Sequence, residues 1–320
     1  MRLRYIRRKC GWALLTLWFV LTANFFLFRI MPGDPIGLLA RSQRLSAEAL
    51  AHQLTLFGLD RPLPLQYLIY LKQTLTGHLG VSIISGTDIS TLIAGRIWPT
   101  VLLVGVGTGL AALVGVLIGI KGGWARGTSF DRSSLYGSLL LYATPEGWLG
   151  MLLLITFAGT LGWFPAGGYT SSSGDTAPQL GDIASHLFLP ALTLTLGYIG
   201  SFVIVMRSSM IDVKDEDYIT TARAKGLSDG QVRRRHAVPN AFLPSFTLIV
   251  LSVGFILGGA IVVETVFSWP GLGLLTYQAI KDQDYPVLQA VFLLSSLAVI
   301  MANLVADITY GFLDPRIEEV

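Results

Sequence analysis

The chain has 320 residues, of which 52% are hydrophobic and 13% are charged, and its mean hydropathy is +0.61. Soluble domains carry about 25% charged residues, so this composition excludes an ordinary soluble protein and indicates an integral membrane protein. The net charge of +3 gives no reason to expect nucleic-acid binding, because the basic residues lie in short segments beside apolar runs.

Six apolar runs are long enough to cross a bilayer, which takes about 20 residues in helical form. Irregular backbone cannot face lipid, so we expect an all-α membrane protein with six transmembrane helices. We place them at 11–30, 98–120, 135–160, 187–207, 241–264 and 287–311. The first follows a basic segment and precedes no small-x-small cleavage site, so we interpret it as an uncleaved helix rather than a signal peptide.

The lysines and arginines are unevenly shared between the connecting segments. They gather in 1–10, 121–132 and 207–239, whereas the connection 163–186 has none. The positive-inside rule therefore predicts that the N and C termini are cytoplasmic.

The residues after the first helix have soluble character and are expected outside the cytoplasm. Ser46–Phe57 and Leu65–Leu75 are predicted to be short helices there, and Thr160–Ser185 is expected to be a flexible outside loop. The predicted division is an N-terminal transmembrane helix (1–31), an extracytoplasmic helical segment (32–97), a five-helix membrane domain (98–313) and a cytoplasmic tail (314–320).

Glycines at helical spacing mark the second predicted membrane helix. Gly105 and Gly109 share one face, as do Gly115 and Gly119. Such pairs allow another helix to approach closely, although membrane helices are also rich in glycine in general, and both interpretations stay open.

Ionisable residues inside membrane segments are candidates for function. Glu146 follows Pro145 in the middle of the third predicted helix, where it could line a translocation path or pair within the bundle. Glu264, near the outer end of the fifth helix, could act in gating or be a simple interfacial carboxylate. Asn303 and Asp307 are interpreted as structural groups near the inner end of the sixth helix.

A charged stretch, residues 215–240, interrupts the apolar runs and is called the elbow below. A first short helix should end at Gly226, a C-terminal cap. Ser228 and Gln231 predict a capping box that begins a second helix, which Pro239 should end.

The elbow resembles the loop E-A-A-x3-G-x9-I-x-L-P of the membrane subunits of ATP-binding-cassette (ABC) importers. The match is at Ala222, Gly226 and Pro239; Thr220, Thr221, His236 and Val238 depart from it. The form D-Y-I-x-T-A-R-A-K-G-L resembles the dipeptide, oligopeptide and nickel permease branch. Further motifs of that branch are M-P-G-D-P (31–35), F-G-L-D-x-P (57–62), G-x-L-G-x-S (77–82), F-P-A-G-G-Y (164–169), H-L-x-L-P-A-L-T-L (186–194), E-x-V-F-x-W-P-G-L-G (264–273), D-Y-P-V-x-Q-A (284–290) and N-L-x-x-D-x-x-Y-x-x-x-D-P-R-I (303–317).

The resemblance implies a type I ABC importer permease in a prokaryotic inner membrane, which moves di- or oligopeptides by alternating access. It also implies a second, related permease, two ATPase subunits and an extracytoplasmic binding protein. ATP and Mg²⁺ would bind the ATPases, because the sequence contains no G-x-x-x-x-G-K-[ST] phosphate loop. Candidate ATPase-coupling residues are Tyr218, Thr221, Ala222, Arg223, Gly226, Arg233, Arg234, His236 and Pro239.

Several alternatives remain open. Glu146, Glu264 and Asp307 could instead serve an ion-coupled secondary carrier, and the importer class could carry nickel or another small solute. An intramembrane enzyme ranks last, because neither G-x-S-x-G nor H-E-x-x-H occurs. The four histidines lack metal-ligand spacing, so neither a catalytic nor a metal site is expected.

Overall fold

The computed structural model describes residues 2–30, 61–171, 179–256 and 260–313. Over these ranges the chain is helical and forms no strand, only an isolated bridge between Val81 and Asp88. The prediction of an all-α membrane protein is therefore confirmed. The predicted helix Ser46–Phe57 lies outside the described residues.

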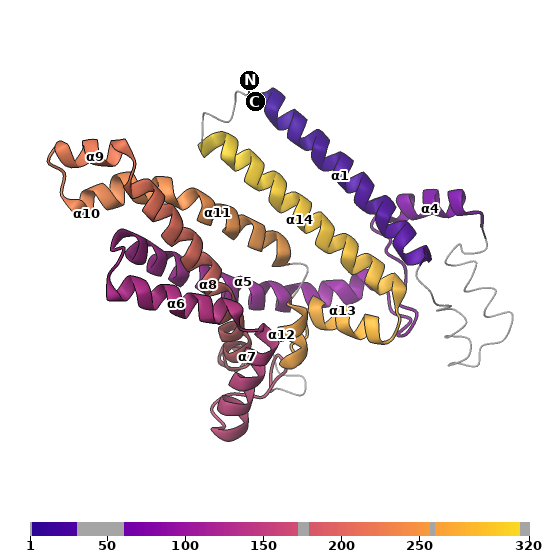
Figure 1. Cartoon of the computed structure of the whole chain (residues 1–320). Helices are drawn as coiled ribbons and strands as arrows, with labels where there is room; N and C mark the ends of the chain where they lie inside the picture. Colours follow the sequence, from indigo (N-terminus) through magenta and orange to yellow (C-terminus); the bar gives the residue numbers. More distant parts are fainter. Residues whose placement is uncertain (1, 31–60, 172–178, 257–259, 314–320) are drawn as a thin grey trace. The chain divides into compact units, whose positions relative to one another are not determined.

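One compact unit combines both ends of the chain, taking Met1–Thr100, Gly254–Ile261 and Pro270–Val320. Its helices are α1 (Arg2–Ile30), α4 (Leu63–Leu75), the start of α5 (Ile89–Trp124), α13 (Leu272–Lys281) and α14 (Tyr285–Leu313). α1 lies along α14 (Figure 1). Between them the buried Asn24 amide donates to the Gln289 carbonyl at 3.1 Å and to the Tyr70 hydroxyl at 3.3 Å. This hydrogen bonding satisfies a polar group inside the first span and ties α4 to it.

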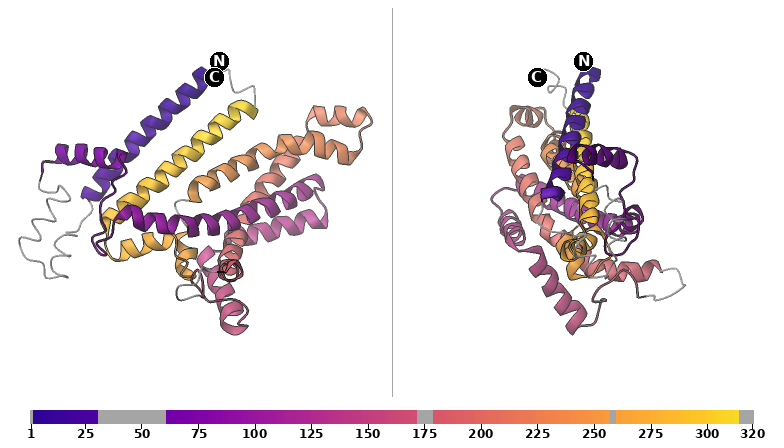
Figure 2. Two further views of the ribbon diagram at one scale, coloured as in Figure 1. Left: turned by 180° about the vertical axis from the view of Figure 1, so that it is seen from behind. Right: turned by 90° about the vertical axis from the view of Figure 1, so that its right-hand side faces the viewer.

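The second unit takes Val101–Val253 and Val262–Trp269. It holds the rest of α5, followed by α6 (Ser129–Ala143), α7 (Glu146–Leu153), the π-helical η1 (Leu154–Thr160), α8 (Leu180–Lys214), α9 (Asp217–Ala224), α10 (Asp229–Val232), the π-helical η2 (Arg233–Ala237), most of α11 (Val238–Phe255) and α12 (Ile261–Val266). α6 packs against α8, and α9 and α10 form a short hairpin at the ends of α8 and α11 (Figure 2).

Within the described ranges, five helices are long and apolar enough to cross a membrane, and they become six if the bent pair α6 and α7–η1 is one span. The five are Tyr5–Phe28, Ile89–Trp124, Leu180–Lys214, Asp229–Gly254 and Tyr285–Thr309. Each of the six predicted runs therefore falls on one of these spans or on the bent pair. α8 begins at Leu180, so the end of the predicted outside loop is helical instead.

The third predicted span is not one helix. α6 and α7 meet at a bend of 97° around Pro145. Thr144 has an extended backbone (ψ 124°), as expected for a residue that precedes a proline, and proline has no N–H to continue the helix. Glu146 is consequently the first residue of α7, which corrects its predicted place in the middle of a helix.

The fifth predicted span, 241–264, is also divided. α11 ends at Phe255, and Glu264 belongs to the separate short helix α12. Residues 257–259, between the two helices, lie outside the described residues.

Glycines bring α5 and α8 into close contact. A Cβ atom built on Gly107, Gly115, Gly119 or Gly123 would lie 2.6–2.7 Å from a side-chain Cβ atom of α8. For Gly105 and Gly109, no atom of the described residues is found within 4 Å of such a Cβ. Close approach is thus confirmed for the Gly115/Gly119 pair, whereas the Gly105/Gly109 pair makes no such contact among the described residues.

Candidate functional site

The elbow has the helix–turn–helix form that its sequence predicts. α9 is followed by Gly226, whose φ of +83° lies in the left-handed region that favours glycine. The Gly226 N–H donates to the Arg223 carbonyl at 2.9 Å, which closes the end of α9. Ser228 and Gln231 form the predicted capping box at the start of α10.

Pro239 does not end the second helix, contrary to the prediction. It is the second residue of α11, and α10, η2 and α11 follow one another without a break. The carbonyls ahead of Pro239 lie in the π-helical turn η2, whose wider hydrogen-bonding pattern accommodates a residue without an N–H. The elbow is therefore continuous with the span that follows it.

The inner face of the elbow has an apolar core. Ile219, Val232 and Ala237 are fully buried there, together with Ala222. They pack with Trp124 of α5 and with Met206 and Met210 of α8. Ala222, predicted to contact the ATPase, thus faces this core and is only 5% exposed.

Trp124, the last residue of α5, fastens the elbow to the membrane helices. Its indole Nε1–H donates to the Asp229 carboxylate at 2.7 Å, and its carbonyl accepts from the Lys214 ammonium at 2.8 Å. The Arg223 guanidinium lies 5.5 Å from the indole ring centre, within the range of a cation–π contact. Arg223 also reaches Asp229 at 3.6 Å. α5, α8, α9 and α10 therefore meet at one tryptophan, which sequence reasoning did not single out.

A second polar contact that the sequence did not reveal joins α6 to α8 in the same unit. Arg207 makes a two-pronged ion pair with Asp131, with N–O distances of 2.5 and 3.0 Å. The Asp131 carboxylate is almost fully buried and also accepts from the Gly127 N–H at 2.9 Å. Buried charges that are both paired and hydrogen-bonded hold their helices in register.

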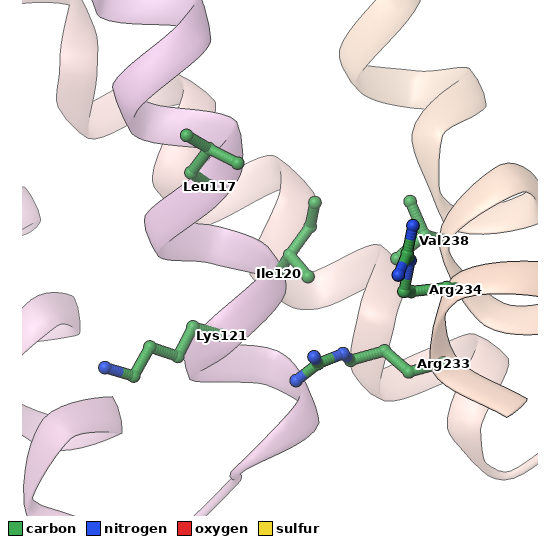
Figure 3. Close-up of a pocket in the computed structure, with 6 residues that line it drawn as sticks. All are labelled: Leu117, Ile120, Lys121, Arg233, Arg234 and Val238. Carbon is green, nitrogen blue, oxygen red and sulfur yellow. The ribbon is translucent and has the colours of Figure 1, made fainter. Parts of the chain in front are cut away.

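The outer face of the elbow carries most of the other candidates. Tyr218, Thr221, Arg223, Gly226, Arg234 and Pro239 are exposed, and Arg233 and His236 are half-buried. Desolvation, aided by Glu216, raises the pKa of the Tyr218 phenol, which is hydrogen-bonded to Asn240. Arg233 and Arg234 point elsewhere, because they line a cavity against α5 (Figure 3).

The remaining candidates belong to other elements. The Glu146 carboxylate is hydrogen-bonded to Tyr198 of α8 and lies against Gly197, which favours pairing within the bundle. Glu264 is fully buried. Asp307 pairs with Lys9 of α1 at 3.0 Å, in keeping with a structural role, and Asn303 is exposed. No group of His, Cys, Asp and Glu side chains among the described residues could hold a metal ion.

Two pairs of the sequence motifs meet in space. The Asp284 carboxylate of D-Y-P-V is buried and accepts from the Ser82 hydroxyl of G-x-L-G-x-S at 2.5 Å. The Gly168 N–H of F-P-A-G-G-Y donates to the Phe267 carbonyl at 2.9 Å, and Tyr169 packs edge-on against the buried Trp269. These contacts therefore hold together segments that lie far apart in the sequence.

The long apolar helices define an integral membrane protein, and comparison with known proteins identifies its family. The chain belongs to the family described as the binding-protein-dependent transport system inner membrane component, which it matches over residues 111–319. Its residues 2–89 match the N-terminal region of the membrane component of such transport systems. It is thus a multi-pass inner-membrane permease subunit of a type I ABC importer in a prokaryote.

Named relatives cover nearly the whole chain. A peptide permease of Brucella suis biovar 1 is 40% identical over 300 residues, or 92% of each chain. The oligopeptide transport system permease protein AppB of Bacillus subtilis is 35% identical over 98% of this chain and 99% of its own. The glutathione transport system permease protein GsiC of Salmonella choleraesuis is 38% identical over the same shares. Among the function classes that the sequence left open, family membership favours the ABC importer over the ion-coupled secondary carrier and the intramembrane enzyme.

Proposed function

We propose that the chain forms half of the translocation path for peptides, with a second, related permease forming the other half. Two ATPase subunits dock on the outer face of the elbow, on the cytoplasmic side, and hold the ATP and Mg²⁺. A binding protein delivers the peptide from outside. The peptide and glutathione permeases among the relatives support this substrate class over nickel.

The observation that carries the coupling role is the continuity of the elbow with two membrane spans. Asp215 and Glu216 alone separate the end of α8 from the start of α9. On the other side, α10 continues through η2 into α11. A displacement of the elbow is therefore transmitted to both spans rather than absorbed by a loose loop.

ATP binding would then bias the path between outward- and inward-open states. Such coupling requires an element whose position differs between the two states and that the ATPase contacts differently in each. The elbow is suited to this role because its apolar core and the Trp124 hydrogen bond attach it to the ends of α5 and α8, so a displacement of the elbow would be passed to these helices.

Gly226→Pro tests the coupling role. Proline cannot adopt a φ of +83° and removes the N–H that closes α9, so the turn must rearrange. We expect the variant to insert normally but to lose substrate-stimulated ATP hydrolysis by the assembled transporter. Gly230→Ala, at a glycine with free space and an ordinary φ, should leave hydrolysis unchanged. Normal peptide uptake by the Gly226→Pro transporter would refute the proposal.

A further inference from the structure

We propose that a cavity between α5 and η2 binds the phosphate headgroup of an anionic phospholipid. The cavity has a volume of about 430 Å³, within the usual range for small-ligand sites. Its lining consists of three apolar and three basic residues: Leu117, Ile120, Val238, Lys121, Arg233 and Arg234. Figure 3 shows the Arg233 side chain extending from η2 toward α5.

The cations of this cavity lack the partners that the other arginines nearby have. Arg207 is paired with Asp131, and Arg223 with Asp229. Arg233 and Arg234 make no ion pair within the described ranges, and no carboxylate lines the cavity. The Lys121 ammonium lies 4.2 Å from the centre of the Phe130 ring. In Figure 3 the Lys121 ammonium points away from the two arginines, so Arg233 and Arg234 supply the positive charge that an anion in the cavity would meet.

The position of the cavity favours a lipid over a soluble anion or an acidic protein segment. Leu117 lies one turn before Lys121 near the end of the α5 span, and its side chain is 58% exposed. One wall is thus apolar and continues along a membrane helix, while the other is cationic and lies where the span ends. Acyl chains match the first wall, and a phosphate, which arginine binds through paired N–H groups, matches the second. The site lies at a membrane boundary whichever side the elbow faces.

Lipid retention on the purified full chain, with any subunits that accompany it, tests this site. The protein is equilibrated in nanodiscs containing equal amounts of phosphatidylglycerol and phosphatidylcholine, and bound lipids are measured by native mass spectrometry. Each basic residue near an anionic lipid contributes roughly a fivefold preference, so Arg233→Gln/Arg234→Gln should lower the phosphatidylglycerol preference by roughly 25-fold. Lys225→Gln/Arg235→Gln removes two exposed charges of the elbow outside the cavity and should leave the preference unchanged.

Three results would overturn the proposal. The first is a wild-type chain that shows no preference for phosphatidylglycerol. The second is an equal loss of that preference in both double variants. The third is an Arg233→Gln/Arg234→Gln chain that retains lipid as the wild type does but co-purifies with less ATPase. The last would assign these arginines to a protein partner. If the double variant does not fold, Arg233→Gln alone decides: it should lower the preference by roughly fivefold, and an unchanged preference in that folded chain would contradict the site.

Discussion

Trp124 is the residue on which the attachment of the elbow most depends. Its indole donates to Asp229 of α10, its carbonyl accepts from Lys214 of α8, and its ring packs against Arg223 of α9. The ring itself is buried, whereas the Asp229 side chain is 67% exposed. Water can therefore partly replace the indole as a donor to Asp229. Apolar packing of the ring thus contributes more to the attachment of the elbow than the hydrogen bond does.

Trp124→Phe separates these two contributions. Phenylalanine retains most of the ring but cannot donate to Asp229, so we expect α10 to open more easily by about 1 kcal/mol. Amide hydrogen exchange in α9 and α10, followed by mass spectrometry, should accelerate roughly fivefold. Trp163→Phe, the same change at a 65% exposed tryptophan, should not alter exchange in the elbow. Unchanged exchange in the Trp124→Phe chain would mean that the hydrogen bond to Asp229 contributes nothing to the attachment of the elbow.

The α5–α8 pair shows how small residues act at the scale of an element. Four glycines of α5 face α8, and the Thr195 hydroxyl donates to the Gly107 carbonyl at 3.1 Å and to Ala191 at 2.7 Å. Inside a membrane, helices associate through such close packing and hydrogen bonds rather than through the hydrophobic effect. α5 and α8 also supply the two helix ends on which the elbow sits.

Gly119→Ala should weaken this helix pair. The added methyl group would lie 2.7 Å from the Met206 Cβ and 2.9 Å from the Val203 carbonyl, so the helices must separate, at a cost of about 1–3 kcal/mol. Gly109→Ala, where nothing lies within 4 Å, should cost no stability. Thermal denaturation in detergent measures the difference, and equal midpoints for the two variants would argue against close packing at Gly119.

The sequence correctly predicted those turns and helix caps that neighbouring residues specify. Gly226 and the Ser228–Gln231 pair specify their turn through their own backbone and caps, and both predictions are confirmed. Pro145 and Pro239 show the limit of this reasoning. Pro145 precedes the first residue of α7, where a proline is tolerated, whereas Pro239 lies inside the continuous helix α10–η2–α11, where the π-helical turn accommodates it; the sequence alone did not distinguish these two cases. Trp124 and the Asp131–Arg207 pair depend on partners 76 to 105 residues away, so no local pattern indicates them.

At the scale of the whole molecule, we propose that the chain is one of two permease subunits and that ATPases on other chains drive it through its elbow. The motifs spread along the sequence serve this assembly differently. The Ser82–Asp284 and Gly168–Phe267 contacts join segments that lie far apart in the sequence, while the exposed face of α9 makes no comparable contact among the described residues. That face is where the proposal places the ATPase.

Site-specific crosslinking tests this claim most directly. A photoreactive amino acid is placed at Thr221, on the exposed face of α9, and at Gln73, an exposed residue of α4. After illumination of native membranes, the account predicts that a P-loop ATPase is crosslinked through Thr221 and not through Gln73. Capture of the ATPase through Gln73, or its absence at Thr221 in a transporter that still takes up peptide, would contradict the coupling role of the elbow.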